Sequence, residues 1–412
     1  MRGAFLPHLL ITLVITTVST AEFQINTRTS NNQANPAIAQ DANGNFVIIW
    51  SSYFGSGRSN DILGQRFDPN GTPIGNEFQI NTITPGNQTE SSIAMNAVGN
   101  FVVAWQGPGV DEEDIFLQRF DPNGQTIGDE TLVNTYTQGQ QLYPKVAIDN
   151  SGAFAVVWEN EKLESKITVI SCQLFDANGL AVSEEFNINA TVNCRYPDVA
   201  MDLNGNFVIV WMEDKSSNSI MAQLYNADGT AKTEPFQVNT VENNFLTEPA
   251  IAMNANGYFV VTWDGDHVKA GLDDIHARLF DPNGMPLGEQ FIVNTSRAEA
   301  QQNPQVAMNN KGEFVIVWES KIESSTIERD IFGQQFNSSG QPVGDEFLIN
   351  TYVEGDQRNS DVAIRENGEF VTVWQSDDQD GSGWGIFGEI NSMADFIEVT
   401  SDDATETQEH SQ

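Results

Sequence analysis

The sequence predicts an all-β protein that folds as a seven-bladed β-propeller, with four antiparallel strands in each blade. Three observations support this prediction. A tryptophan that closes a β-rich run recurs every 52 to 56 residues, a motif of the form EFxxNT also occurs seven times, and glycine-containing turns separate the runs. The recurring tryptophans are Trp50, Trp105, Trp158, Trp211, Trp263, Trp318 and Trp374.

Each repeat contains four β-rich runs and no helical periodicity. In the second repeat the runs are SIAM (residues 92–95), FVVAW (101–105), DIFLQRFD (114–121) and ETLVNT (130–135). The turns after the first and third runs place Asn or Asp before Gly, as in the DPNG sequences that begin at Asp68, Asp121 and Asp281. Glycine adopts positive φ there without steric cost, which hairpin turns require. A β-solenoid would need shorter coils, so the period favours propeller blades.

The two ends of the chain predict how the ring closes. The EFxxNT motif begins, with small variations, at Glu22, Glu77, Glu130, Glu185, Glu234, Glu289 and Glu346. The first copy precedes the first complete repeat, whereas the last repeat stops after residues 386–390 without a copy. We therefore expect residues 23–27 to form the outer strand of the last blade, which removes the open edge. The alternative closure would use residues 395–399.

The blade pattern resembles seven-bladed propellers of the WD-repeat and kelch type in architecture, without their signature motifs. The sequence FVVxW, followed by QRFDxxG and EFxVNT, resembles repeats of large exported bacterial surface proteins. This resemblance covers Glu22 to about Ile390 and implies the propeller fold and an extracellular or surface location. It implies no functional residues.

The N-terminus predicts export. Arg2 precedes an apolar stretch at residues 9–18 that is too short to span a bilayer, and small residues at Ser19 and Ala21 fit a cleavage site. We expect residues 1–21 to be a signal peptide, residues 22–391 the propeller, and residues 392–412 an acidic disordered tail. No later segment is apolar enough to predict membrane insertion.

The charge of the chain bounds its partners. It carries 57 acidic and 19 basic residues, for a formal net charge of −38. The electrostatic field of such a negative charge repels nucleic acid and anionic lipid and attracts cations and basic partners. The same negative charge is equally expected of a protein whose acidic surface only keeps it soluble. Ca²⁺ binding and a solvated acidic surface are therefore two alternative interpretations of the charge.

The candidate site lies on one face of the propeller. The turns between the first and second strands, and between the third and fourth, lie on one face of the propeller. They are short and nearly the same in every repeat, which is typical of turns with a purely structural role. The opposite face carries the loops between second and third strands and the connections between blades, which differ in every repeat. Loops on a rigid scaffold often carry function. We therefore expect a ligand to bind at this variable-loop face, around the mouth of the central channel.

Candidate metal ligands are Asp378, Asp380 and Ser382, which form an acidic turn around Gly381. Oxygen ligands at alternate positions can bind Ca²⁺, but the helices and the twelfth-position glutamate of an EF-hand are missing, and a plain acidic turn fits equally. His267 and His276 share the fifth repeat and are a weaker candidate pair. His276 occupies the position of Phe116 and Phe332, which indicates packing.

In an exported protein, cysteines can form disulfides and Asn-x-Ser/Thr sequons can be glycosylated. Cys172 and Cys194 are the only cysteines and predict one disulfide between neighbouring repeats. Asn-x-Ser/Thr sequons, which matter if the host glycosylates proteins, occur at Asn70, Asn87, Asn189, Asn294 and Asn337. Asn294 belongs to an EFxxNT strand end, so we expect it to be partly protected.

Catalytic motifs are missing from the sequence, which contains no nucleophile elbow, phosphate-binding glycine loop or zinc-protease motif. Arg66, Arg119 and Arg278 share one register, which favours packing between blades over an anion site. The leading hypothesis is a secreted, monomeric recognition propeller whose partner is a glycan, a protein or a matrix component. The alternatives are a hydrolase or lyase that uses channel carboxylates, and an acidic calcium-binding matrix protein.

Overall fold

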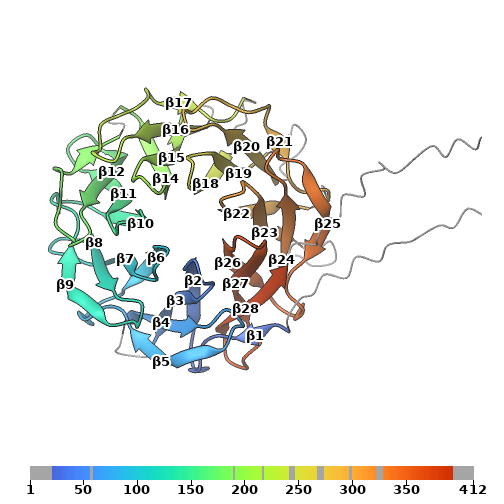
Figure 1. The fold of residues 1–412 in the computed structure, drawn as a ribbon. Helices are drawn as coiled ribbons and strands as arrows, with labels where there is room; N and C mark the ends of the chain where they lie inside the picture. The colour runs from blue at the N-terminus through green and yellow to red at the C-terminus, as the bar shows by residue number, and fades with distance from the viewer. Residues whose placement is uncertain are drawn as a thin grey trace, which may run out of the picture.

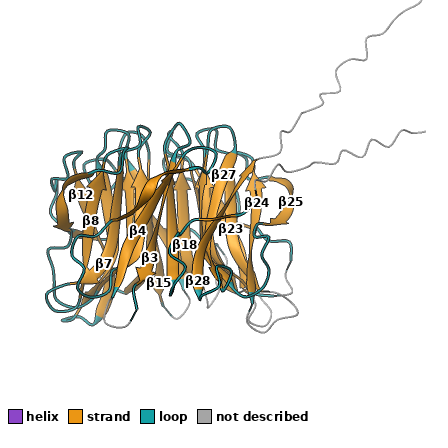
Figure 2. Cartoon of the chain, turned by 90° about the horizontal axis from the view of Figure 1, so that it is seen from below, coloured by secondary structure: helices purple, strands orange, loops and turns teal. Residues whose placement is uncertain are grey.

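The computed structural model describes residues 21–392, apart from residues 56–58, 189–190, 216–217, 241–245, 267–272, 297–298 and 322–327. Seven four-stranded antiparallel sheets surround a central channel, as Figure 1 shows. Seen from the side, the sheets stand next to one another with loops at both rims (Figure 2). The predicted all-β, seven-bladed propeller is confirmed. Within the described residues, no helix is long and apolar enough to cross a membrane.

Every blade runs outward from the channel in four strands. The innermost strands are β2 (Gln33–Gln40), β6 (Thr89–Met95), β10 (Gln141–Ile148), β14 (Asn193–Met201), β18 (Leu246–Met253), β22 (Gln301–Met308) and β26 (Gln357–Ile364). The second strands are β3 (Phe46–Tyr53), β7 (Phe101–Pro108), β11 (Phe154–Lys162), β15 (Phe207–Asp214), β19 (Phe259–Asp266), β23 (Phe314–Lys321) and β27 (Glu369–Asp377).

The outer half of each blade is more variable. The third strands are β4 (Asn60–Phe67), β8 (Glu113–Phe120), β12 (Ile167–Phe175), β16 (Ser219–Tyr225), β20 (Asp273–Phe280), β24 (Arg329–Phe336) and β28 (Trp384–Ser392). The outermost strands are β5 (Pro73–Gln79), β9 (Thr126–Leu132), β13 (Phe186–Asn187), β17 (Phe236–Gln237), β21 (Phe291–Ile292), β25 (Pro342–Leu348) and β1 (Phe23–Gln24). The outermost strands of the third, fourth and fifth blades have only two residues each.

The core lies between neighbouring blades. All seven repeated tryptophans are fully buried. Trp50 of the first blade packs in one cluster with Val371 and Val373 of the last, and Trp263 packs with residues of the blade before it. In four blades the indole N–H donates to a glutamine seventeen residues earlier, as in the 2.9 Å bond from Trp158 to Gln141. The buried N–H is thereby satisfied at little cost to packing.

The ring closes through the N-terminal strand, as predicted. In the last sheet β1 pairs with β28, with Phe23 opposite Gly388. Beyond the strand, Ile25 N–H donates to the Ile386 carbonyl at 2.8 Å, and Asn26 accepts the Ile386 N–H at 2.6 Å. Residues 395–399, the alternative closing segment, lie outside the described residues.

At six junctions among the described residues, the EFxxNT motif joins an outermost strand to the preceding blade. The glutamate of one copy accepts the backbone N–H of the threonine that ends the copy before it, as in the 2.8 Å bond from Thr135 to Glu185. Glu22 closes the circle by accepting the Thr351 N–H at 2.8 Å and its hydroxyl at 2.6 Å. In the sixth copy Gln290 accepts the Thr240 N–H at 2.6 Å, so the acceptor is Gln290 rather than the Glu289 that the sequence suggests.

This contact can be tested by removing the carboxylate that closes the ring. We expect Glu22→Ala to lower the free energy of unfolding by about 1–2 kcal/mol, because the hydrogen bonds that this charged acceptor receives from Thr351, Tyr352 and Gln379 are lost. Glu289→Ala, which removes an exposed carboxylate one position from the acceptor, should leave stability unchanged. Urea denaturation followed by tryptophan fluorescence measures both. Equal effects of the two substitutions would contradict the assignment.

Candidate functional site

The mouth of the channel is built by a β-bulge repeated in every blade. Each innermost strand shifts register against its neighbour near its start, and one non-glycine residue there has a φ between +47° and +55°. These seven residues, here called the mouth ring, are Asn35, Glu90, Tyr143, Tyr196, Glu248, Asn303 and Asn359. Left-handed backbone at such residues is uncommon and costs roughly 1–3 kcal/mol each, and it clusters at functional sites.

The mouth ring lies at the variable-loop face. The start of each innermost strand pairs with the end of the second strand, as Gln33 with Ser52, next to the loop that leads to the third strand. The connections between blades enter the innermost strands at this same end. The bulges therefore direct seven side chains toward the end of the channel that the sequence favours.

Neighbouring blades hold the bulges in place. In four junctions the residue after the repeated tryptophan accepts the bulge N–H of the next blade. These bonds run from Asn35 to Gln375 (2.9 Å), Tyr143 to Gln106 (3.0 Å), Tyr196 to Glu159 (2.7 Å) and Asn359 to Glu319 (2.8 Å). Because each bond crosses between blades, ring assembly stabilises the strained backbone.

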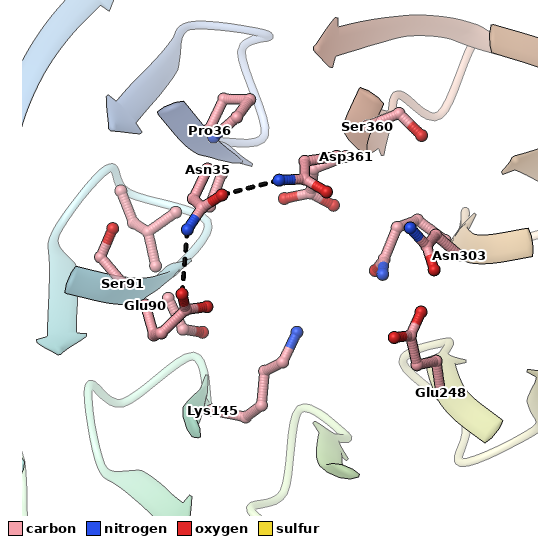
Figure 3. A pocket seen from close by; sticks show the side chains of 14 residues that line it. Asn35, Pro36, Glu90, Ser91, Lys145, Glu248, Asn303, Ser360 and Asp361 are labelled. Carbon is pink, nitrogen blue, oxygen red and sulfur yellow. Dashed lines mark hydrogen bonds between the residues drawn. The ribbon is translucent and has the colours of Figure 1, made fainter. Parts of the chain in front are cut away.

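The mouth ring has two chemically different halves. The asparagines of the sixth, seventh and first blades form one arc, in which Asn359 Nδ2 donates to Asn35 Oδ1 at 2.7 Å and Asn303 Nδ2 donates to Glu319 Oε1 at 2.7 Å. Asn35 Nδ2 continues the chain to Glu90 Oε1 at 3.0 Å (Figure 3). The other arc runs from Glu90 through two tyrosines to Glu248.

The tyrosines add aromatic surface to the second arc. Tyr143 is 41% exposed. Partial burial raises its pKa, and the nearby charges of Glu90, Glu159 and Glu248 raise it further, whereas Arg195 lowers it. Tyr196 is half-buried and has the same acidic neighbours, Glu248 and Glu159. This arc therefore combines aromatic faces with hydrogen-bond acceptors.

A cavity of about 390 Å³ is lined in part by five residues of the mouth ring, Asn35, Glu90, Glu248, Asn303 and Asn359. Its wall includes Ser92, Lys145, Gln305 and Asp361, which stand two residues after the bulge position in their strands. Asp361 Oδ2 accepts the Ile38 N–H of the next blade at 2.9 Å. Asp198, at the same register, likewise accepts the Ile251 N–H at 2.9 Å. These two carboxylates thus bind neighbouring blades together at the channel wall.

Burial perturbs the channel carboxylates. It raises the pKa of Glu248 to about 7, with Glu319 adding to the rise and Lys145 opposing it. It raises the pKa of Asp361 to about 6 and that of Glu159 to about 7, against hydrogen bonds from backbone N–H groups. Glu248 and Asp361 line the polar cavity, and carboxyls with such shifts in a cavity are candidates for binding or for proton transfer.

The carboxylates of the predicted metal ligands accept hydrogen bonds, mostly from backbone N–H groups of their own loop. Asp378 Oδ1 accepts the Gly383 N–H at 2.8 Å, Asp380 Oδ1 accepts the Ser382 N–H at 3.1 Å, and Asp380 Oδ2 accepts from Asn26 at 3.2 Å. Among the described residues, no group of three or more His, Cys, Asp and Glu side chains is arranged to hold a metal ion. Ca²⁺ binding by this turn stays a prediction.

The other sequence candidates lie away from the mouth ring. Cys172 and Cys194 are both fully buried in one apolar cluster and are free thiols, so the expected disulfide is not formed in this structure. The Cys194 thiol instead donates to the Val192 carbonyl at 3.6 Å. His276 is buried and stacks on Trp263 with ring centroids 5.8 Å apart, which fits a packing role. His267 lies outside the described residues.

The sequons differ in accessibility. Asn70 and Asn87 are exposed, and Asn337 is half-buried in a turn between the third and fourth strands. Asn294 is only 3% exposed, and its amide donates to Asp274 at 2.7 Å and accepts the Ile275 N–H at 2.8 Å. Asn189 lies outside the described residues. Glycosylation at the exposed positions stays a prediction.

The repeated arginines pack between blades, as their register indicates. Arg66 and Arg119 each donate to a turn carbonyl of the next blade, Pro122 at 2.9 Å and Ala177 at 3.0 Å. Arg278 donates to the Val238 carbonyl of the previous blade at 2.8 Å. None of these three contributes to the wall of the channel cavity.

Sequence reasoning missed the mouth ring, although a signal exists. In every repeat the bulge residue is followed by Pro or Ser, as in Asn35-Pro36, Glu90-Ser91 and Tyr143-Pro144. The bulge position itself varies between Asn, Glu and Tyr, so it does not stand out among the many polar residues of the chain.

The shifted carboxyls predict an unusual pH dependence of stability. The pKa of Glu159 is higher in the folded chain than its ordinary value of 4.5, so the folded state binds more protons between pH 4.5 and about 7. Its contribution to stability is present below pH 4.5 and is lost as pH rises to about 7, by an amount on the order of 3 kcal/mol.

Glu159→Gln tests this contribution, because Gln106 and Gln375 make the equivalent bond in other blades. We expect the variant to lose less stability than the wild type between pH 5 and pH 7.5 in urea denaturation. Glu289→Gln serves as the exposed control. Identical pH profiles for Glu159→Gln and the wild type would show that Glu159 titrates normally.

Comparisons with known proteins agree on the fold. No protein-family model matches the chain, and no curated protein matches it. Among solved structures, a protein of unknown function from Dyadobacter fermentans is 10% identical with a TM-score of 0.54, covering 92% of this chain and 99% of its own. An α-L-arabinanase from Penicillium chrysogenum complexed with arabinobiose is 12% identical with a TM-score of 0.53 and the same coverage.

A polysaccharide lyase named as an ulvan lyase is 9% identical with a TM-score of 0.55, covering 90% of this chain and 95% of its own. At such low identity these likenesses concern the fold alone. The chain is similar in architecture to propellers that include glycan-acting enzymes, and its own family is not shown by them.

Proposed function

We propose that this protein is an exported recognition propeller that binds a glycan at the mouth of its channel, on the variable-loop face. The observation that carries the proposal is the mouth ring, in which five amide and carboxylate side chains line one cavity and two tyrosines lie near its carboxylates. A concave site with convergent polar groups on a rigid frame is the usual form of a small-ligand site.

The chemistry of the ring fits a sugar. Amides donate and accept hydrogen bonds in a plane, carboxylates accept them from hydroxyl groups, and tyrosine rings offer apolar faces next to a polar edge. Asn303, Asn359 and Asn35 supply the first kind of group, Glu90 and Glu248 the second, and Tyr143 and Tyr196 the third. The arabinanase that shares the fold was solved with a disaccharide, which supports a glycan as the ligand class.

Catalysis on the glycan is a second candidate, favoured by one observation. Glu248 borders the cavity, and its pKa of about 7 is close to that required of a general acid or base near neutral pH. A lyase or hydrolase would use this carboxyl for proton transfer. Turnover of a bound oligosaccharide that Glu248→Gln abolishes would favour an enzyme, whereas binding without turnover favours recognition.

Glycan binding can be tested at the aromatic arc. We expect the wild type to bind members of an immobilised glycan array, and the double substitution Tyr143→Asn and Tyr196→Asn to weaken the strongest interaction at least about tenfold. Asparagine occupies this register in three other blades, so the bulge backbone is preserved. Titration calorimetry gives the affinities.

Val98→Ala provides the matched control, because Val98 is 62% exposed in a turn on the opposite face. It should bind as the wild type does. An array without any bound glycan, or an equal loss in both variants, would refute binding at the mouth ring.

A further inference from the structure

Two charged side chains of the cavity are held by no hydrogen bond within the described residues. Lys145 extends from β10 toward the middle of the cavity, and Glu248 projects from β18 at the edge of the cavity next to Asn303 (Figure 3). Within the described part of the chain, neither side chain makes a hydrogen bond or an ion pair. An ammonium and a carboxylate of one cavity thus keep free hydrogen-bonding capacity.

The remaining charged groups near the cavity are already engaged. Glu90 accepts a hydrogen bond from Asn35, and Asp361 accepts backbone N–H groups of Ile38 and Val362 at 2.9 and 2.8 Å. Glu319, behind Asn303, pairs with Arg329 at 3.0 Å. Their roles in holding the ring leave Lys145 and Glu248 as the charged groups available to a ligand.

The cavity wall holds charges of both signs, with three carboxylates (Glu90, Glu248 and Asp361) and one ammonium (Lys145). Lys145 is the sole lysine or arginine among the residues that line the cavity, and it interacts electrostatically with Glu90, Asp198, Glu248 and Asp361. An anion bound to Lys145 would lie among these carboxylates, and a cation bound to Glu248 would lie near the ammonium. A like charge beside a bound ion weakens its binding in a partly desolvated site.

A hydroxyl group suits this arrangement because it accepts one hydrogen bond and donates another. One hydroxyl can accept from the Lys145 ammonium and another can donate to the Glu248 carboxylate, and both bonds gain strength from the charged partner. The wall adds Asn303, Asn359 and Gln305, whose amides also donate and accept. Such a wall matches a ligand with many hydroxyl groups and no charge.

We infer that Lys145 and Glu248 together bind hydroxyl groups of a neutral sugar, and that the site selects against uronic acids and amino sugars. This inference rests on the proposed glycan-binding function. It assigns Lys145 and Glu248 as the pair that determines specificity, whereas the tyrosine arc contributes aromatic surface at the opening.

The test compares three disaccharides of different charge by titration calorimetry with the full chain. Arabinobiose represents neutral sugars, digalacturonate represents acidic sugars, and a disaccharide of glucosamine represents cationic sugars. We expect arabinobiose to bind more tightly than either charged disaccharide. Lys145→Met should weaken arabinobiose binding at least about tenfold and Glu248→Gln at least about fivefold, since each loses a charge-assisted hydrogen bond.

Matched controls lie on the opposite face. Lys311→Met and Glu313→Gln remove a lysine and a glutamate from a turn between the first and second strands of the sixth blade and should leave binding unchanged. Lys145→Arg keeps the charge and should retain more affinity than Lys145→Met. Thermal melting of each variant establishes that the fold is intact.

Other outcomes would overturn the inference in distinguishable ways. Tight binding of digalacturonate that requires Lys145, or of the glucosamine disaccharide that strengthens in Lys145→Met, would show a charged ligand and preserve the glycan proposal. Arabinobiose binding that neither substitution weakens would also preserve it and remove the pair from recognition. Failure of all three disaccharides, together with an empty glycan array, would reject the proposed function itself.

Discussion

The structure depends on burying each repeated tryptophan between two blades. No blade completes a core alone: the cluster around Trp50 draws on strands of the first and last blades, and the other clusters follow the same rule. Each fully buried aromatic contributes about 2–3 kcal/mol only when both neighbours are present. The first and last blades must therefore meet, and the pairing of β1 with β28 is a consequence of the same requirement.

Closure also permits the strained backbone from which the mouth ring is built. Seven left-handed residues would together cost about as much as a typical domain's net stability if nothing supported them. Cross-blade acceptors such as Glu159 and Glu319 supply that support, because a bulge N–H of one blade is satisfied by the blade before it. The geometry of the site is thus repeated sevenfold, while the side chain at each bulge is free to differ. Because the backbone is repeated and the side chains vary, one arc of the mouth ring carries amide side chains and the other carries acidic and aromatic side chains.

The fold could be predicted from the sequence because its signals repeat. Trp50 and its six equivalents fixed the number of blades, and the unmatched copy of EFxxNT at Glu22 predicted the closing strand. The site could not be predicted in the same way. Asn35 and Tyr143 occupy equivalent bulges but share neither residue type nor the glycine that usually marks positive φ. Which of the 57 acidic residues converge depends on blade order around the channel, and Cys172 and Cys194, expected to pair, are buried as separate thiols.

The net charge of the molecule does not determine the charge of the ligand that its cavity binds. A net charge of −38 suggests a cationic partner, yet charges on the outer surface are screened over about 10 Å at moderate salt. Inside the cavity the relevant charges are few and close, and Lys145 opposes the carboxylates there. Local balance decides which group enters the channel, while the acidic exterior governs solubility and the approach of other molecules. A protein can therefore be strongly acidic and still present a site suited to an uncharged ligand.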